Sequence, residues 1–274
     1  MTKSEKKLNE LPIYLRKLSS LKIRDATSHA RIALLPIGSI EQHGDHLPVD
    51  TDLTIIEYLA EEALKAARIE TGEPIGFIAP SLPYGGPEMG MQEWEGTLSI
   101  KPSTLIDMLV SIGTGLHRAG FEYIVLMNGC VGNIPALSLA VQRLKQSIPD
   151  GNFIFVDGFW QNGDVIEAVR ESGTGGSGHA GEIETSLMLV LDPDQVSMGD
   201  AAPGKFHHPS PLISFDLTHS NPFFWPVPFG ELTHNGVLGD PTLASVEKGQ
   251  KILDVNVQHL KSILCHLYSL HENH

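Results

Sequence analysis

Six side chains that can bind a metal ion occur within about a dozen consecutive positions. They are Glu41, His43, Asp45, His46, Asp50 and Asp52. They directly follow the apolar run 31–37, which is typical of a buried strand. Carboxylates and imidazoles that converge at a strand end repel one another, or are costly to bury, unless a cation neutralises them. The segment therefore predicts a metal site, and a metal site of this kind points to hydrolytic chemistry.

The elements that must position these side chains alternate between strand and helix. Strands are predicted over residues 31–37, 74–79, 123–127 and 153–157. Helices are predicted over residues 52–68, 102–119, 134–147, 187–191 and 242–270. This alternation predicts an α/β fold in which residues 1–274 form a single three-layer domain, with a mostly parallel sheet and helices on both faces. The stretch 203–240 has little periodicity, and we expect an ordered loop or a lid there.

Polar side chains are concentrated in three segments at or near the predicted strand ends, namely 41–52, 128–133 and 179–186. In a parallel sheet these segments emerge at one edge. Glu41 and His43 are separated by one residue, so in extended backbone they point to the same side. Asp52 begins the following helix and can also face the strand ends. Oxygen and nitrogen ligands in this mixture suit Zn²⁺, Mn²⁺ or Fe²⁺ better than Ca²⁺.

The overall composition excludes several classes of partner. The 19 basic and 33 acidic side chains leave a net charge of −14, which argues against nucleic acid and anionic membranes as partners. We find no apolar run long enough to span a membrane and no signal-peptide pattern at the N-terminus. The two cysteines, Cys130 and Cys265, exclude a disulfide framework and fit a reducing compartment. We therefore expect a cytoplasmic protein that acts on a small molecule.

Several segments together resemble the creatininase (creatinine amidohydrolase) family. The most specific is PIGSIEQHGDHLP at 36–48, with Thr51 and Asp52 behind it. Weaker agreement comes from GT at 96–97, NGCVGN at 128–133, HAGEIETS at 179–186 and GVLGDP at 236–241. These segments occur in order and span nearly the whole chain.

The resemblance implies a compact α/β domain in a homo-oligomer, often a hexamer, with a dinuclear metal centre at the strand ends. It implies a metal-dependent amidohydrolase that cleaves an amide-type C–N bond, in a cyclic amide or a formamide, of a small molecule. At least one relative instead opens an oxidised inositol ring, so hydrolysis of a cyclic ketone or lactone is the alternative.

The resemblance also implies roles for individual residues. Glu41 would bind the first metal, His43 the second, and Asp52 would bridge the two. Glu184 would supply a further ligand or a general base. His179 would move a proton during catalysis.

The chain departs from the family pattern after the third predicted strand. Cys130 stands where the family usually has a metal-binding histidine, and Gly132 stands where creatininase has an acidic residue. The Cys130 thiolate could ligate a softer ion such as Zn²⁺, or Cys130 could be a small buried thiol without a metal bond. One or two metals per subunit both fit. The change at Gly132 disfavours creatinine as the natural substrate.

Two further readings stay open from the sequence. Loss of a ligand could leave a metal-poor, non-catalytic binding protein, although the other ligand-type residues are retained. Cys130 could instead act as a nucleophile paired with His179, which the carboxylate-rich set argues against. Four aromatic residues are candidates for a ring-stacking wall, with core or interface packing as the alternative. They are Trp160, Phe223, Phe224 and Trp225.

Overall fold

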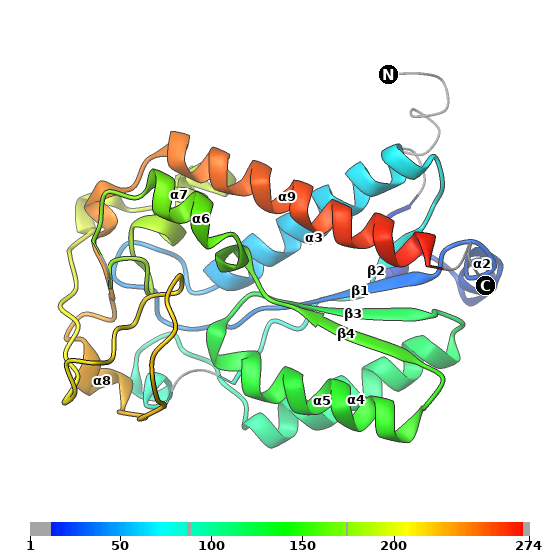
Figure 1. Cartoon of the computed structure of the whole chain (residues 1–274), viewed down its shortest axis with the longest axis horizontal. Coiled ribbons are helices and arrows are strands. Elements are labelled where there is room, and N and C mark those ends of the chain that lie inside the picture. The colour runs from blue at the N-terminus through cyan, green and yellow to red at the C-terminus, as the bar shows by residue number, and fades with distance from the viewer. Residues whose placement is uncertain (1–11, 87–88, 174, 271–274) are drawn as a thin grey trace.

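A four-stranded parallel sheet forms the centre of the protein, which is described by a computed structural model over residues 12–86, 89–173 and 175–270 (Figure 1). The strands are β1 (Ile32–Ile37), β2 (Gly76–Ile78), β3 (Tyr123–Asn128) and β4 (Asn152–Val156). Their order is β2-β1-β3-β4, and every neighbouring pair is parallel. After β1 the chain adds β2 on one side of it, and then crosses to the other side to add β3 and β4. Such a change of direction between β1 and β3 is where parallel sheets bind ligands.

Helices cover both faces of the sheet, which confirms the predicted three-layer α/β arrangement. One face carries α3 (Thr51–Thr71), α7 (Glu182–Leu191) and α9 (Val246–Ser269), and the other carries α4 (Pro102–Arg118) and α5 (Ile134–Ser147). Successive residues of a strand pack alternately against the two helical layers, because their side chains point to opposite faces of the sheet. In β1, Leu34 packs in the first layer and Leu35 in the second.

Several element boundaries differ from those predicted. The last helix begins at Val246 rather than at 242, because the side chain of Ser245 accepts a hydrogen bond from the Lys248 amide and caps it. Helix α7 begins at Glu182, five residues before the apolar stretch that predicted it. The short helices α2 (Ser20–Ala26), α6 (Gly163–Val169) and α8 (Phe229–Leu232) were not predicted, because so few residues show no clear periodicity.

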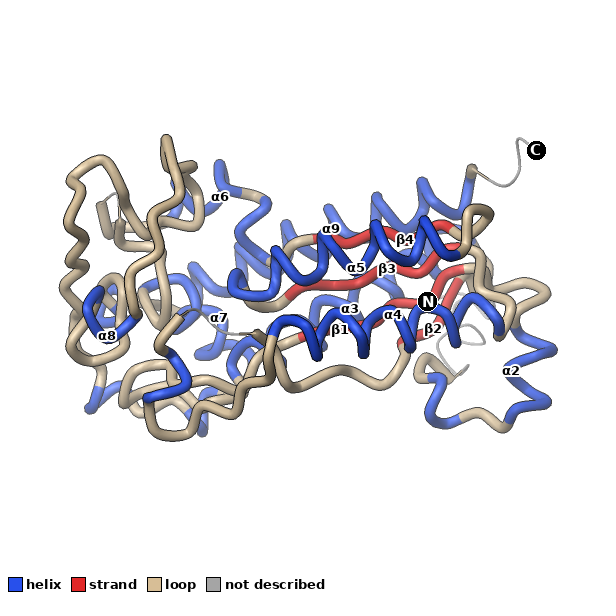
Figure 2. The backbone as a smooth tube through the Cα atoms, turned by 90° about the horizontal axis from the view of Figure 1, so that it is seen from below, coloured by secondary structure: helices blue, strands red, loops and turns tan. Residues whose placement is uncertain are grey.

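Long loops collect at the end of the molecule where the strands end, around α8 (Figure 2). The stretch 203–240 lies there and is largely without regular structure, as expected, apart from α8 and isolated bridges. None of the helices in the described ranges is both long and apolar enough to cross a bilayer.

Candidate metal centre

Glu41 and His43 lie in the loop that follows β1, and both side chains are buried. The Ser39 hydroxyl donates a hydrogen bond of 2.6 Å to Oε2 of Glu41. The loop is held in place by the Glu41 amide, which donates to the Val49 carbonyl over 2.9 Å. The end of β1 therefore delivers a carboxylate and an imidazole into the interior, as the sequence predicted.

Asp52 and Cys130 reach the same place from the first turn of α3 and from the end of β3. Gly129 makes this approach feasible, because a Cβ atom there would lie 2.6 Å from the main-chain oxygen of Asp52. The Cys130 amide donates to Oδ1 of Asn128 over 3.2 Å, and its Sγ lies 3.5 Å from Oε1 of Glu41. The thiol is thus within reach of the carboxylates that surround it.

His179 and Glu184 arrive from the turn before α7 and from its first turn. Ala180 between them has a φ of +52°, a backbone conformation that non-glycine residues rarely adopt. Its amide donates to Oε2 of Glu184 over 2.6 Å, which fixes that carboxylate. Backbone strain of this kind persists where the surroundings hold the chain, and it is common at functional sites.

The ligand-type side chains form overlapping groups of three. One group is Glu41, Asp52 and Cys130, and a second is His43, Asp52 and Glu184. Within each group one potential ligand atom per residue lies within 4.8 Å of the others. Asp52 belongs to both groups. A third group joins Glu41 and His43 to His179. The tertiary structure therefore brings together Glu41, His43, Asp52, Cys130, His179 and Glu184, the residues for which a role at the site was considered. Asp45, His46 and Asp50, which the first segment also offered, belong to none of these groups, and Asp45 is exposed.

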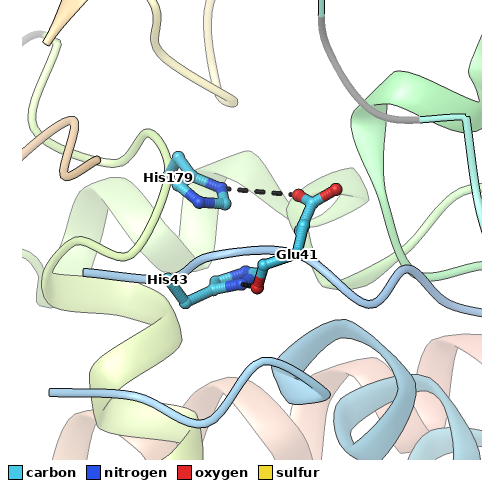
Figure 3. Close-up of side chains that lie close together, drawn as sticks. All are labelled: Glu41, His43 and His179. Atoms are coloured by element: carbon cyan, nitrogen blue, oxygen red, sulfur yellow. Dashed lines mark hydrogen bonds and ion pairs between the residues drawn. The ribbon is translucent and has the colours of Figure 1, made fainter. Parts of the chain in front are cut away.

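The hydrogen bonds of the two histidines leave one ring nitrogen of each facing the site. Nδ1 of His43 lies 3.0 Å from the Glu41 carbonyl oxygen, and Nε2 of His179 lies 2.6 Å from the Gln42 carbonyl oxygen. These nitrogens donate. When the rings are neutral, as a metal ligand must be, this tautomer leaves the lone pairs on Nε2 of His43 and Nδ1 of His179. The ring centroids lie 4.1 Å apart with the planes tilted by 39°, and Nδ1 of His179 lies 3.7 Å from Glu41 (Figure 3).

Burial and crowding displace the ionisation of this cluster. Burial, reinforced by the Asp52 carboxylate, raises the pKa of Glu41 to about 8. Burial also raises the pKa of Glu184 to about 7. Burial lowers the pKa of His43, but the carboxylates of Asp52, Glu184 and Glu41 outweigh it and raise that pKa to about 10. Burial raises the pKa of the Cys130 thiol, and the negative charges of Glu41 and Asp52 raise it further because they disfavour a thiolate. Acids crowded in this way favour a cation among them.

Two buried polar atoms without hydrogen-bond partners indicate whether a cation would fit at this site. Nε2 of His43 and Oδ2 of Asp52 are both buried without a hydrogen-bond partner. Buried polar atoms are rarely left without a partner, and metal-binding histidines commonly donate their other nitrogen to a main-chain carbonyl. His43 has that arrangement. The residues present therefore fit a divalent metal.

The creatinine amidohydrolase family model, Creatininase, matches residues 16–264. The chain belongs to the creatininase family. The family assignment made from the motifs is confirmed, and with it the expectation of a hydrolase of this family. His46, which lies within the first motif, is buried, and its Nε2 lies 2.9 Å from the hydroxyl of Thr185, the residue after Glu184. It therefore links the two motifs of this creatininase-family site.

Curated relatives in the family carry different activities. A mycofactocin precursor peptide peptidase of Mycobacterium ulcerans is 31% identical over 226 residues, covering 80% of this chain and 78% of its own. A creatinine amidohydrolase of Pseudomonas putida is 30% identical over 241 residues, covering 83% and 86%. A 3-dehydro-scyllo-inosose hydrolase of Thermotoga maritima is 26% identical over 270 residues, covering 92% and 82%. Membership in the family therefore leaves the substrate open.

Solved creatininase structures share the fold. A manganese form has a TM-score of 0.74 at 26% identity, covering 94% of this chain and 99% of its own. A Zn–Zn type of a creatininase mutant has a TM-score of 0.75 at 25% identity, with the same coverage. These metal-bearing forms agree with the prediction of a divalent metal as the cofactor.

The cavity at this creatininase-family site is walled by apolar side chains that sequence reasoning mostly missed. Met91, Phe215, Leu217 and Phe229 line it together with the ligand-type residues. Met91 and Phe229 begin short helices, whereas Phe215 and Leu217 lie in a loop. No spacing signal connects these three segments, which are far apart in the sequence. Of the predicted aromatic wall, Trp160 does line the cavity. The other three members, Phe223, Phe224 and Trp225, are exposed and line none of the cavities described here.

Proposed function

We propose that the protein is a metal-dependent hydrolase that cleaves an amide-type C–N bond of a small molecule. Glu41, Asp52 and Cys130 would hold one ion, and His43, Asp52 and Glu184 a second, with Asp52 bridging. The observation that carries the proposal is the sharing of buried Asp52 between two groups of three ligand-type side chains. The unpartnered atoms of His43 and Asp52 support it.

The proposed metal is Zn²⁺, with Mn²⁺ or Fe²⁺ as alternatives. A thiolate favours Zn²⁺ over hard ions, whereas the group of His43, Asp52 and Glu184 offers only nitrogen and oxygen, which suit any of the three. Because each group offers three ligands, we propose two ions per chain.

A divalent ion bound here supplies Lewis-acid activation of water and of the scissile carbonyl. The protein's own contribution is positioning and proton transfer. Burial, together with the neighbouring His43, keeps the pKa of His179 well below its usual value. Its ring is therefore neutral at pH 7, with Nδ1 free to accept a proton from the attacking water and return it to the leaving nitrogen. Glu184 is held by the Ala180 amide, and we propose it as a ligand that also assists this transfer.

Ring opening of a cyclic ketone or lactone is the second candidate. The similarity to the inosose hydrolase, which covers 92% of this chain, favours it. The products distinguish the two reactions, because amide hydrolysis releases an amine or ammonia whereas ring opening of a ketone or lactone does not. Creatinine is not favoured as the natural substrate, because Gly132 offers no acidic side chain at the position the resemblance implies.

Metal analysis and turnover test the proposal together. We expect about two equivalents of Zn²⁺, Mn²⁺ or Fe²⁺ per chain by elemental analysis, and loss of activity after chelation that the added metal restores. Small formamides and cyclic amides should release amine, measured directly. A protein that takes up no metal on reconstitution contradicts the proposal and supports the binding-protein alternative.

Two further predictions carry over from the sequence. We expect a homo-oligomer, a hexamer by resemblance to the family, and a cytoplasmic location. Light scattering of the purified protein tests the assembly, and fractionation of cells that produce it tests the location.

A further inference from the structure

A second cavity adjoins the candidate metal centre. It has a volume of about 240 Å³ and is lined by Val131, Ile134, Trp160 and six residues of the segment 214–221. We call it the outer cavity, and the cavity at the ligand-type residues the inner cavity. Val131, Trp160, Phe215 and Leu217 line both. The two cavities are therefore neighbours that share one set of walls.

The two cavities differ greatly in size. The inner cavity has a volume of about 30 Å³, which is room for about two water-sized groups. A substrate can place only a small group there, because the ions that Glu41, Asp52, Cys130 and Glu184 would hold take up part of the same space. The outer cavity is about eight times larger, from 240 and 30 Å³, and it can take the remainder of a small molecule.

The walls of the outer cavity are preformed. Asp216 accepts hydrogen bonds from Arg170 at 2.8 Å and from the Ser177 hydroxyl at 2.7 Å, and the Leu217 amide donates to the Ser177 carbonyl at 3.1 Å. The side-chain amide of Asn221 pairs with both main-chain groups of Ser214, at 2.9 and 2.8 Å. The segment that carries Phe215 and Leu217 is thereby held in place, without any need to order on binding.

The outer cavity offers an anion no unpaired cation. Among the residues that the structure describes, no lysine or arginine lines either cavity, and His219, which lines the outer one, has its Nδ1 3.7 Å from Asp216 and 3.8 Å from Glu167. Arg170 is largely buried and is already paired with Asp216 and Glu167. The side chain of Asp216 is 0% exposed, and its charge is neutralised by Arg170 inside the wall of the cavity. A phosphate or carboxylate placed here would lose its hydration without gaining a countercharge.

We propose that the outer cavity is a binding subsite for an uncharged apolar or aromatic group. The substrate would then be a neutral amide whose scissile bond is terminal, with only a formyl group or a primary carboxamide group, carbonyl included, entering the inner cavity. This inference rests on the proposed function and narrows its substrate class. Five of the nine residues that line the outer cavity are apolar, and the polar ones, Ser214, Asp216, His219 and Asn221, already make contacts with one another or with neighbouring residues. Mainly apolar walls with a few placed polar groups are typical of small-molecule sites.

Three amides test the subsite by calorimetric titration of the metal-loaded full chain. Benzamide has a small terminal group and a neutral ring, 4-carbamoylbenzoate adds a negative charge, and benzanilide is bulky on both sides of the amide. We expect benzamide to bind at least about tenfold more tightly than either of the others, a difference of about 1.4 kcal/mol. Equal or tighter binding of either of the others, or no binding of benzamide, overturns the inference.

Substitutions at the wall sharpen the test. Leu217→Lys should weaken benzamide and strengthen 4-carbamoylbenzoate, each by about tenfold, because it places a cation in the subsite. Leu217→Ala adds no charge, so it should weaken the binding of benzamide without strengthening that of 4-carbamoylbenzoate. This variant replaces Leu217→Lys in the test if the lysine variant does not fold. Phe224→Ala is the matched control, since Phe224 is 89% exposed and lines neither cavity. An unchanged preference in both Leu217 variants overturns the inference.

Turnover separates this inference from the proposed function. Formanilide carries a formyl group on an aromatic amine, and its hydrolysis is measured by release of aniline. Selective binding of benzamide without hydrolysis of any amide would retain the subsite and reject the proposed function. Hydrolysis of amides without a binding preference for benzamide would retain the proposed function and reject the subsite.

Discussion

Nε2 of His43 and Oδ1 of Asp52 lie 3.2 Å apart in the interior, yet Nε2 has no hydrogen-bond partner. The two side chains come from different elements, the loop after β1 and the first turn of α3. Asp52 also lies within ligand reach of Glu41 and Cys130. This relationship supports the proposed pair of ions and makes Asp52 the residue on which both depend.

Asp52→Asn keeps the size of the side chain and removes its charge. We expect turnover to fall by more than about 100-fold, because loss of even a supporting partner of a ligand costs 10–100-fold. Metal content should fall with it, while the circular dichroism spectrum stays native. Asp45→Asn, a change at an exposed carboxylate in the same segment, is the control. Normal metal content and turnover in Asp52→Asn would contradict the bridging role.

Cys130 can be tested as a ligand through a spectroscopic signal. We expect the cobalt-substituted protein to show a thiolate-to-cobalt charge-transfer band that Cys130→Ala lacks, and elemental analysis to show one metal fewer in that variant. Cys265→Ala should leave both unchanged, since Cys265 lies on α9 and in none of the ligand groups. Bound cobalt without the band would make Cys130 a packing residue.

His179→Gln addresses proton transfer. We expect kcat to fall by about 10²–10⁴-fold, the range for loss of a general acid–base group, with metal content unchanged. The exposed His234→Gln serves as the control. A fall in metal content would instead make His179 a ligand, as its grouping with Glu41 and His43 allows.

Asp216→Asn tests the wall of the outer cavity through stability. Arg170 and the Ser177 and Thr218 hydroxyls oppose burial and hold the pKa of Asp216 far below its usual value. The carboxylate therefore stabilises the fold above its unfolded pKa of about 3.9, and this contribution is lost as pH falls towards the folded pKa. We expect Asp216→Asn to lower the free energy of unfolding by about 3–5 kcal/mol at pH 7.

Urea unfolding at several pH values measures this effect. The difference from the unsubstituted protein should shrink below about pH 4, because there the carboxylate protonates in the unfolded chain first. Glu167→Gln, at the exposed partner of Arg170, should cost less than about 1 kcal/mol. A difference that stays constant down to acid pH would contradict the role of the Asp216 charge.

Local sequence determined the parallel sheet, its covering helices and the place of the site. Short apolar runs such as 31–37 favour buried strands, and parallel strands bring their carboxyl ends to one edge. The ligand-type residues Glu41, His43 and Asp52 lie within one short segment, so their convergence followed from chain connectivity. The family motifs extended the set to Glu184 and His179. Short helices such as α8 escaped prediction, because four residues carry no periodic signal.

Tertiary structure decided what surrounds these residues. The approach of Cys130 to Asp52 depends on Gly129 of a second strand end, and the free nitrogen of His43 depends on where one carbonyl oxygen lies. The wall residue Leu217 comes from a loop whose position is set by long-range contacts such as the pairing of Asp216 with Arg170, and Phe229 begins the short helix α8. Such contacts leave no pattern in neighbouring residues, so cavity size and charge, and with them the substrate class, are properties of the folded chain.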